Sequence, residues 1–312
     1  MENIILSLNV VLPLFLTVAL GYFIKRIKLI DKHTLKVMNN VTFKIFLPTL
    51  LFYNVYKTNL DGVFNIKLMI FAPSSIIISC LFMCIIIPLI EKENARRGVL
   101  IQTIFRSNFV LFGIPVVISL FGDDAIGITS LLIAVVVPTF NFLAVIVLEI
   151  FRGGHINIKA IIKGIAKNPL IIASALGLMA LFINIKLPVF METAIQDISK
   201  IATPLALVIL GGEFEFSRLK GNIRNIFIGV FGRLIFIPSI FIPISIAMGF
   251  RDIELASVLI MFSAPTAVSS FTMAEQMGAD SELAGQLVVF TTAISIVTIF
   301  LWVLLIKQLG YF

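Results

Sequence analysis

Apolar runs of about 20 residues recur along almost the whole chain, and short segments that carry the charged residues separate them. A helix needs roughly 20 apolar residues to cross the hydrocarbon core of a bilayer. Inside lipid the backbone must satisfy its own hydrogen bonds, and a helix does so within a single segment. The pattern therefore predicts an all-α polytopic membrane protein. The composition, 59% hydrophobic and 13% charged, agrees with this class.

Ten of these runs are predicted to be transmembrane spans. They cover residues 4–24, 35–56, 67–90, 98–121, 125–150, 167–185, 190–212, 225–249, 253–274 and 283–306. No long polar insertion separates them, so residues 1–312 are predicted to form one membrane domain.

The basic residues lie mainly in the loops after the first, third, fifth and seventh spans. Cytoplasmic loops of membrane proteins carry an excess of Lys and Arg, so these loops are predicted to be cytoplasmic and both termini extracytoplasmic. The net charge of +7 is therefore interpreted as a topology signal, and no nucleic-acid partner is expected.

Two features recur between the halves of the chain. The pattern K-I-x-x-P begins at Lys44 in the second span and at Lys200 in the seventh. A proline interrupts the fourth span, at Pro115, and the ninth, at Pro265. These matches predict two repeats of five spans, residues 1–151 and 152–312. Because five is odd, the second repeat must enter the membrane in the opposite sense, as an inverted repeat.

The fourth and ninth spans are predicted to be broken helices. Proline removes a backbone donor and glycine loosens the helix, so the breaks are expected at Gly113 to Pro115 and around Pro265, where Thr266 and Ser269 follow. In lipid such breaks persist only where protein buries them or a wet cavity adjoins them. Each break leaves a half-helix N-terminus with partial positive charge, and two such ends favour an anion.

Asn108 and Arg106 are further candidates for this anion site. Asn108 lies two helical turns before Pro115 on the same helix face and offers an amide. On an ideal helix Arg106 and Asn108 point about 200° apart, so both face one ligand only if the break rotates them. Arg106 and Arg233 are cations inside predicted spans, which is costly and commonly functional. Both also lie close enough to the interface to snorkel, and snorkelling is the expectation for Arg233.

Several ordered motifs run from the first span to the ninth. The pattern N-x4-G-x-P-x6-G is present as Asn108, Gly113, Pro115 and Gly122. The segments "LGYFIKRIKLI", "FLPTLLF", "TPLALVILG" and "SAPTAVSSFTMAEQMGAD" accompany it in order. Together these motifs resemble the auxin efflux carrier family, which includes bacterial malate and malonate permeases and the plant PIN-type auxin exporters. The resemblance covers nearly the whole chain.

The resemblance implies a ten-helix transporter of the bacterial cytoplasmic membrane, related to the NhaA and bile-acid-symporter folds, in which broken helices 4 and 9 cross. It also implies elevator-type transport of small organic anions such as carboxylates, by a protein that contacts membrane lipid and often works as a homodimer. The substrate-binding candidates are Asn108, Gly113, Pro115, Pro265, Thr266, Ser269 and Arg106. The third span lacks the acidic residue of the plant members, so neither auxin as substrate nor proton coupling through that residue is expected.

Other functions fit the sequence less well. No H-E-x-x-H or G-x-S-G motif is present, so an intramembrane enzyme is not expected. A channel or receptor does not require two broken helices in inverted repeats. The alternative that stays open is a sodium- or proton-coupled symporter of the bile-acid-symporter type. No cofactor is expected, and Na⁺ and H⁺ are the two candidates for a coupling ion.

Overall fold

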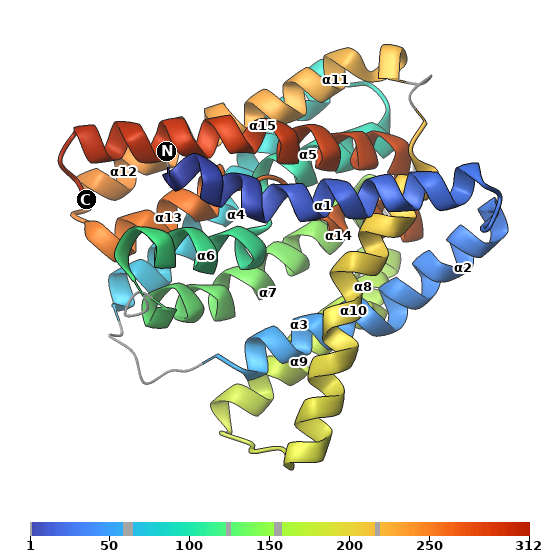
Figure 1. Cartoon of the computed structure of the whole chain (residues 1–312), viewed down its shortest axis with the longest axis horizontal. Coiled ribbons are helices and arrows are strands. Elements are labelled where there is room, and N and C mark those ends of the chain that lie inside the picture. Colours follow the sequence, from blue (N-terminus) through green and yellow to red (C-terminus); the bar gives the residue numbers. More distant parts are fainter. Residues whose placement is uncertain (1, 59–64, 123–125, 153–157, 216–218) are drawn as a thin grey trace.

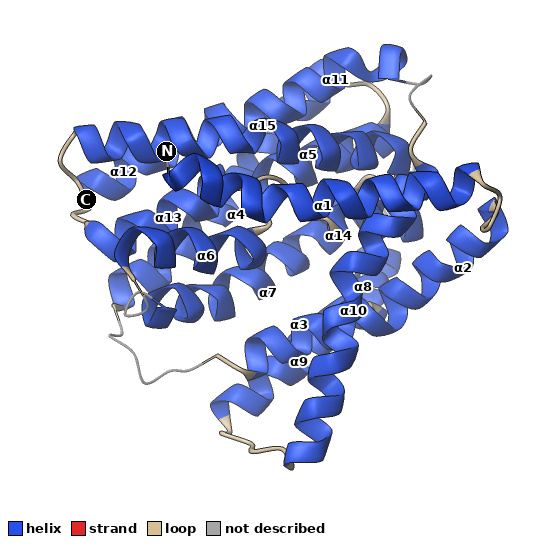
Figure 2. Cartoon of the chain, viewed as in Figure 1, coloured by secondary structure: helices blue, strands red, loops and turns tan. Residues whose placement is uncertain are grey.

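The computed structural model describes residues 2–58, 65–122, 126–152, 158–215 and 219–312 (Figure 1). Within these residues every regular element is a helix, and no strand is present (Figure 2). The elements are α1 (Glu2–Arg26), α2 (Lys32–Val41), the π-helix η1 (Thr42–Phe46), α3 (Leu47–Tyr56), α4 (Ile66–Ile90), α5 (Asn94–Phe105), α6 (Phe109–Phe121), α7 (Ile126–Ile150), α8 (Ile158–Lys167), α9 (Pro169–Phe182), α10 (Val189–Glu213), α11 (Leu219–Phe231), the π-helix η4 (Gly232–Phe236), α12 (Ile237–Ala247), α13 (Asp252–Ser263), α14 (Ser269–Gln276) and α15 (Ser281–Gln308).

These helices coincide with the apolar runs of the sequence. In the described parts of the chain, six segments are long and apolar enough to cross a membrane: Ile66–Ile90, Asn94–Phe121, Gly127–Ile150, Val189–Glu213, Gly221–Ala247 and Ser281–Gln308. Of the other predicted spans, the first falls on α1, and the second, sixth and ninth fall on shorter or interrupted helices. The prediction of an all-helical polytopic membrane protein is therefore confirmed.

The helices form two packed groups. α1 packs against α10, and α3 packs against both α9 and α10. Figure 1 shows α10 crossing α1 steeply and then running beside α3 and α9 into a protruding lobe. We call α1, α2, η1, α3, α9 and α10 the α10 group. The helices α4–α7, α11, η4 and α12–α15 pack mainly on one another, for example α4 on α5 and α13 on α12, and we call them the α13 group. Helix α8 contacts both α7 and α9 and belongs to neither group.

Glycines let α1 and α10 approach each other closely. A Cβ atom built on Gly21 would lie 2.0 Å from the backbone oxygen of Val208, and one built on Gly211 would lie 1.9 Å from that of Val18. No side chain fits at either distance, so the two backbones are in contact. Small residues at helix crossings serve this purpose in membrane proteins.

The most deeply buried helices are the first halves of the two interrupted spans. In α5 every residue from Gly98 to Phe105 is buried, and in α13 every residue from Leu255 to Ser263 is buried. A helix that is buried on all sides lies inside a large protein core rather than against lipid. By contrast, α4 exposes a series of large apolar side chains, among them Ile70, Ile78 and Leu89.

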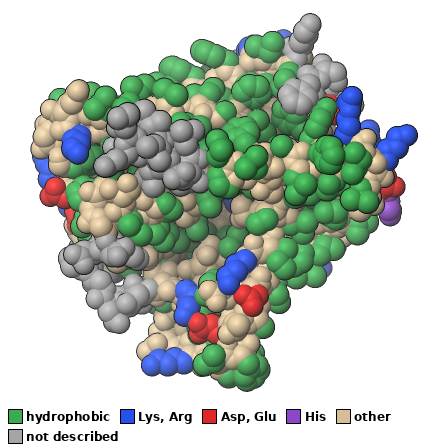
Figure 3. Space-filling model, viewed as in Figure 1, with side chains coloured by type: hydrophobic (Ala, Val, Ile, Leu, Met, Phe, Trp, Pro, Cys, Tyr) green, Lys and Arg blue, Asp and Glu red, His purple; other side chains and the backbone are tan. Residues whose placement is uncertain are grey.

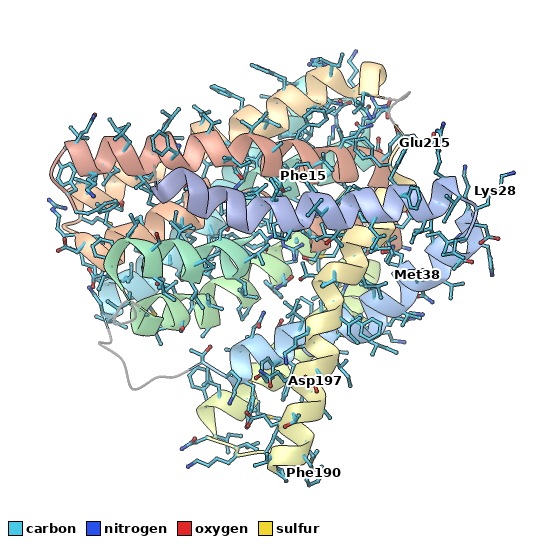
Figure 4. The ribbon with its side chains drawn as sticks, viewed as in Figure 1. Phe15, Lys28, Met38, Phe190, Asp197 and Glu215 are labelled. Atoms are coloured by element: carbon cyan, nitrogen blue, oxygen red, sulfur yellow. The ribbon has the colours of Figure 1, made fainter. Side chains whose placement is uncertain are left out.

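The surface has the distribution expected for a protein embedded in lipid. Figure 3 shows hydrophobic side chains over most of the visible face, with charged side chains gathered at its ends and on the lobe. α10 runs from Phe190 at the tip of the lobe, past Asp197, to the end of the molecule where Lys28 and Glu215 lie (Figure 4). In Figure 1 the marks N and C both lie in the left half of the view, away from the end where Lys28 and Glu215 lie.

Candidate functional site

The fourth predicted span is interrupted between α5 and α6. The N–H of Arg106 still donates to the carbonyl of Gln102 at 3.0 Å, but Arg106 itself is extended, with φ −91° and ψ 131°. Helix α6 then begins at Phe109, with Asn108 as its N-cap residue. The interruption therefore covers Arg106 to Asn108.

The ninth predicted span is interrupted between α13 and α14. The intervening residues, Ala264 to Val268, are buried and lie outside any helix. The two interruptions meet, because the backbone N–H of Asn108 donates to the carbonyl of Pro265 at 2.8 Å. Broken helices from distant parts of the sequence thus contact each other through their non-helical residues, and we call this region the crossing.

The predicted position of the first break is wrong. Gly113 and Pro115 lie inside α6, and the chain leaves the helix several residues earlier. The physical reason is tertiary: the N–H of Asn108 finds an acceptor in the other broken span, which no local pattern reveals. Gly113 instead makes room for an aromatic ring, since a Cβ built on it would lie 2.8 Å from Cε2 of Phe109.

Arg233 holds the ends of both first half-helices. Its guanidinium donates to the carbonyls of Ile104 at 3.1 Å and Phe105 at 3.2 Å, and to those of Met261 and Ala264 at 2.8 Å each. The side chain is completely buried, so the expectation that it snorkels to the interface is wrong. It stays inside because helix-terminal carbonyls, which lack intrahelical donors, supply its partners there.

A cavity of about 400 Å³ lies beside the crossing, between the two helix groups. Leu47, Leu50 and Asn54 of α3, together with Thr203 and Ala206 of α10, line its wall on the α10 group. The opposite wall, on the α13 group, consists mainly of Arg106, Ser107, Asn108, Phe109, Val110, Leu111, Ile114, Pro115, Val137, Phe140, Asn141, Ala267, Val268 and Ser269.

Of the residues that the structure describes, Arg106 is the only basic one that lines this cavity. Only 3% of it is exposed. Its guanidinium donates to Asn141 Oδ1 and Ser269 Oγ, both at 2.7 Å, and contacts Met273 Sδ at 2.7 Å. These partners are all neutral, and no ion pair between described residues includes Arg106. Arg106 therefore brings a positive charge to the cavity wall, and no carboxylate of the described residues is paired with it.

The structure brings four of the seven candidate residues to the cavity: Arg106, Asn108, Pro115 and Ser269. The other three, Gly113, Pro265 and Thr266, do not line it. Pro265 contributes its carbonyl to the contact between the breaks, and the Thr266 N–H donates to Thr291 Oγ1 at 3.3 Å. The break does turn Arg106 and Asn108 toward one cavity, as facing a common ligand would require.

Sequence reasoning missed Asn141 and Asn54 in the cavity wall. Asn141 is buried in α7, where its amide donates to the carbonyl of Val137 at 2.8 Å while its oxygen accepts from Arg106. Each is an asparagine within a predicted apolar span, which is the same signal that selected Asn108. The sequence pattern does not predict the packing that brings α3 and α7 to the crossing.

A second cavity, of about 300 Å³, lies where α1, α10 and α14 end. Charges of both signs line it, among them Lys25, Lys36, Glu213 and Glu275. Among the residues that the structure describes, no group of three or more His, Cys, Asp or Glu side chains is placed to hold a metal ion.

The chain is similar in sequence to known transport proteins. A family model described as "Membrane transport protein" matches residues 6–303. The chain is 26% identical to an uncharacterized transporter of Methanocaldococcus jannaschii, over 95% of this chain and 98% of that one. It is 21% identical to an uncharacterized transporter of Escherichia coli, over 85% and 86%. A "Putative malonate transporter" of Rhizobium meliloti is 26% identical over 45% of this chain and 44% of its own.

Proposed function

Because the chain belongs to the membrane transport protein family, the auxin efflux carrier family that its motifs predicted, we propose that it carries small organic anions, carboxylates in particular, across the membrane. It is a multi-pass integral membrane protein and a transporter, not an enzyme. The anion binds in the cavity beside the crossing, and the two helix groups move relative to each other to expose it to either side.

The observation that carries this proposal is the unbalanced charge of Arg106. A buried cation without a counter-charge is costly, because its desolvation is repaid only in part by neutral hydrogen-bond partners. A carboxylate in the cavity supplies the missing charge. The planar guanidinium also matches a carboxylate in shape, since two parallel N–H groups can donate to its two oxygens.

The rest of the cavity suits a small ligand with one charged end. Ligand sites are mostly apolar, with a few polar groups that fix orientation. Here leucine, valine and phenylalanine side chains surround a polar cluster of Arg106, Asn108, Asn141 and Ser269. Asn108 is also the N-cap residue of α6, whose N-terminal N–H groups favour an anion. The name of the Rhizobium meliloti relative makes malonate the first compound to test.

We further propose the finer architecture of ten spans in two inverted repeats, residues 1–151 and 152–312. The contact between the breaks of the fourth and ninth spans supports crossed broken helices. The α10 group would be the fixed scaffold and the α13 group the moving body of an elevator, because the cavity lies between them.

We place both termini on the extracytoplasmic side of a bacterial cytoplasmic membrane. The loops rich in Lys and Arg support this orientation. It puts α3 and α6 in the outer half of the membrane, so we place the cavity that they line between the crossing and the outer face. An inside-negative potential of about 100 mV favours the exit of each negative charge by about 2.3 kcal/mol, so export needs no coupled ion.

The test is transport by the purified protein in liposomes. Uptake of labelled malonate, malate and indole-acetate is measured with an imposed potential of either sign, and empty liposomes serve as the control. We expect potential-dependent movement of at least one dicarboxylate. If none of the carboxylates moves under either potential, the anion assignment is wrong.

A further inference from the structure

Arg233 lies behind the crossing, away from the cavity, and the proposed anion site does not use it directly. It belongs to η4, a π-helical turn between α11 and α12, and its side chain is completely buried. Among the described residues, all of its hydrogen bonds to the crossing go to backbone carbonyls, two from the end of α5 and two from the end of α13. A single side chain thus ties together the first halves of both broken spans.

The charges at this point balance without a carboxylate. The C-terminus of a helix carries roughly half a negative charge, so two such ends offset about one positive charge. Ile104 and Phe105 are the last residues of α5, and Met261 and Ala264 flank the end of α13. Among the described residues, no ion pair includes Arg233. The two helix ends are therefore its counter-charge.

Carriers with unwound helices commonly coordinate a sodium ion with freed carbonyls and half-helix C-termini. We propose that Arg233 is a positioning residue that serves as the fixed cation of the crossing. Its guanidinium binds the carbonyl oxygens that a dissolved cation would otherwise bind. This inference rests on the proposed function, since it concerns how the anion site is held. Its consequence is that the site keeps its shape and its affinity without sodium.

The positioning acts through adjacent residues. Phe105, whose carbonyl Arg233 binds, is followed directly by Arg106, which faces the cavity. Ala264, also bound by Arg233, is followed by Pro265, whose carbonyl accepts the Asn108 N–H. Arg233 therefore fixes the backbone one residue before each contact that shapes the polar end of the cavity.

Three variants test the proposal. Arg233→Lys keeps a positive charge, and Arg233→Gln removes it while keeping a long polar side chain. Arg224→Gln is the matched control, because Arg224 lies on α11, is exposed and donates to the helix-terminal carbonyl of Ile90 at 2.6 Å, away from the crossing. Each protein is purified in lipid nanodiscs. Its thermal unfolding midpoint and its malonate affinity are then measured in sodium, choline and guanidinium chloride at one ionic strength.

For the wild type and Arg224→Gln we expect equal midpoints in sodium and choline, and malonate affinities that agree within twofold. Arg233→Gln should bind malonate at least tenfold more weakly in choline and unfold at a lower temperature. Sodium or guanidinium should restore part of both losses, because the four carbonyls are then free to bind the added cation. Arg233→Lys should stay within threefold of the wild type.

Two results overturn the inference. One is saturable stabilisation of the wild type by sodium, which would mean that a dissolved cation has its own site. The other is Arg233→Gln behaving like Arg224→Gln in every salt. If no protein binds malonate, or any other carboxylate in the same assay, the proposed function fails. The salt dependence of the unfolding midpoints then still decides the role of Arg233 by itself.

Discussion

Arg106 is the residue on which anion recognition depends. We expect Arg106→Gln to weaken malonate binding by about 3 kcal/mol, roughly a hundredfold in Kd, because the ligand's charge then lacks its partner in a buried site. Arg106→Lys should recover part of the loss, since an ammonium restores the charge but not the fork that pairs with both oxygens. Calorimetric titration of the purified protein with malonate measures both effects.

The control is Arg224→Gln, which removes an exposed arginine outside the cavity. It should leave the Kd unchanged. If Arg106→Gln binds malonate as tightly as the control while keeping its fold, the anion does not sit against Arg106.

Glu91 is a buried carboxylate that links the end of α4 to α11. Its oxygens accept from the N–H groups of Lys92 at 2.7 Å and Glu93 at 2.9 Å, and from the amide of Asn225 at 2.7 Å. Burial by itself would raise the pKa of Glu91. The bonds from Glu93, Asn225 and Lys92 outweigh burial and hold the pKa below its ordinary value of 4.5.

A lowered pKa has a definite consequence for stability. The ionised carboxylate stabilises the fold at pH values above 4.5, and this contribution is lost as the pH falls through the lower pKa of the folded state. At pH 7 we expect Glu91→Gln to lower the free energy of unfolding by about 1 kcal/mol, and the variant therefore unfolds at a lower temperature. Between pH 5 and 3, measured by thermal unfolding, the wild-type and variant midpoints should converge. Parallel curves over that range would contradict this account.

At the scale of the helix, the contact between α1 and α10 tolerates no side chain. Gly211→Ala would place a methyl group 1.9 Å from the Val18 oxygen, so the helices must separate. We expect a loss on the order of 3 kcal/mol and a lower thermal unfolding midpoint in detergent. Gly221→Ala is the control, because a Cβ there meets nothing within 4 Å, and it should leave the midpoint unchanged or slightly higher. Equal midpoints for the two variants would show that α1 and α10 do not need this approach.

Helix extents could be predicted from the sequence, whereas the position of the first break could not. The apolar runs are local, so their ends match those of α4, α10 and α15 closely. The first break depends instead on an acceptor at Pro265, distant in sequence from Asn108. Proline alone did not locate it, since α6 continues through Pro115.

The same distinction separates the candidate residues. Asn108, Arg106 and Ser269 were identifiable because polar groups are expensive inside an apolar span. The role of Arg233 was not, because its partners are backbone carbonyls, which every residue has and no sequence pattern marks. Asn141 carried the same signal as Asn108, and only the packing of α7 shows that it orients Arg106.

At the scale of the whole molecule, the proposed transport requires the α13 group to move past the α10 group. Phe15 of α1, Leu207 of α10 and Val289 of α15 line one small cavity on the contact between the groups. We expect a short thiol cross-link between Phe15→Cys and Val289→Cys, which joins the two groups, to stop malonate transport. Binding should persist within about threefold, because the link does not enter the anion cavity.

The matched control joins two helices of the same group. Phe15 and Leu207 line the same small cavity, but α1 and α10 should move together. A cross-link between Phe15→Cys and Leu207→Cys should therefore leave transport intact. Both pairs are made in a chain without the natural Cys80 and Cys84, and reduction of the link should restore transport to the first pair. If transport continues with α1 and α15 joined, the groups do not move as rigid bodies. If the α1–α10 link also stops transport, the boundary between them lies elsewhere.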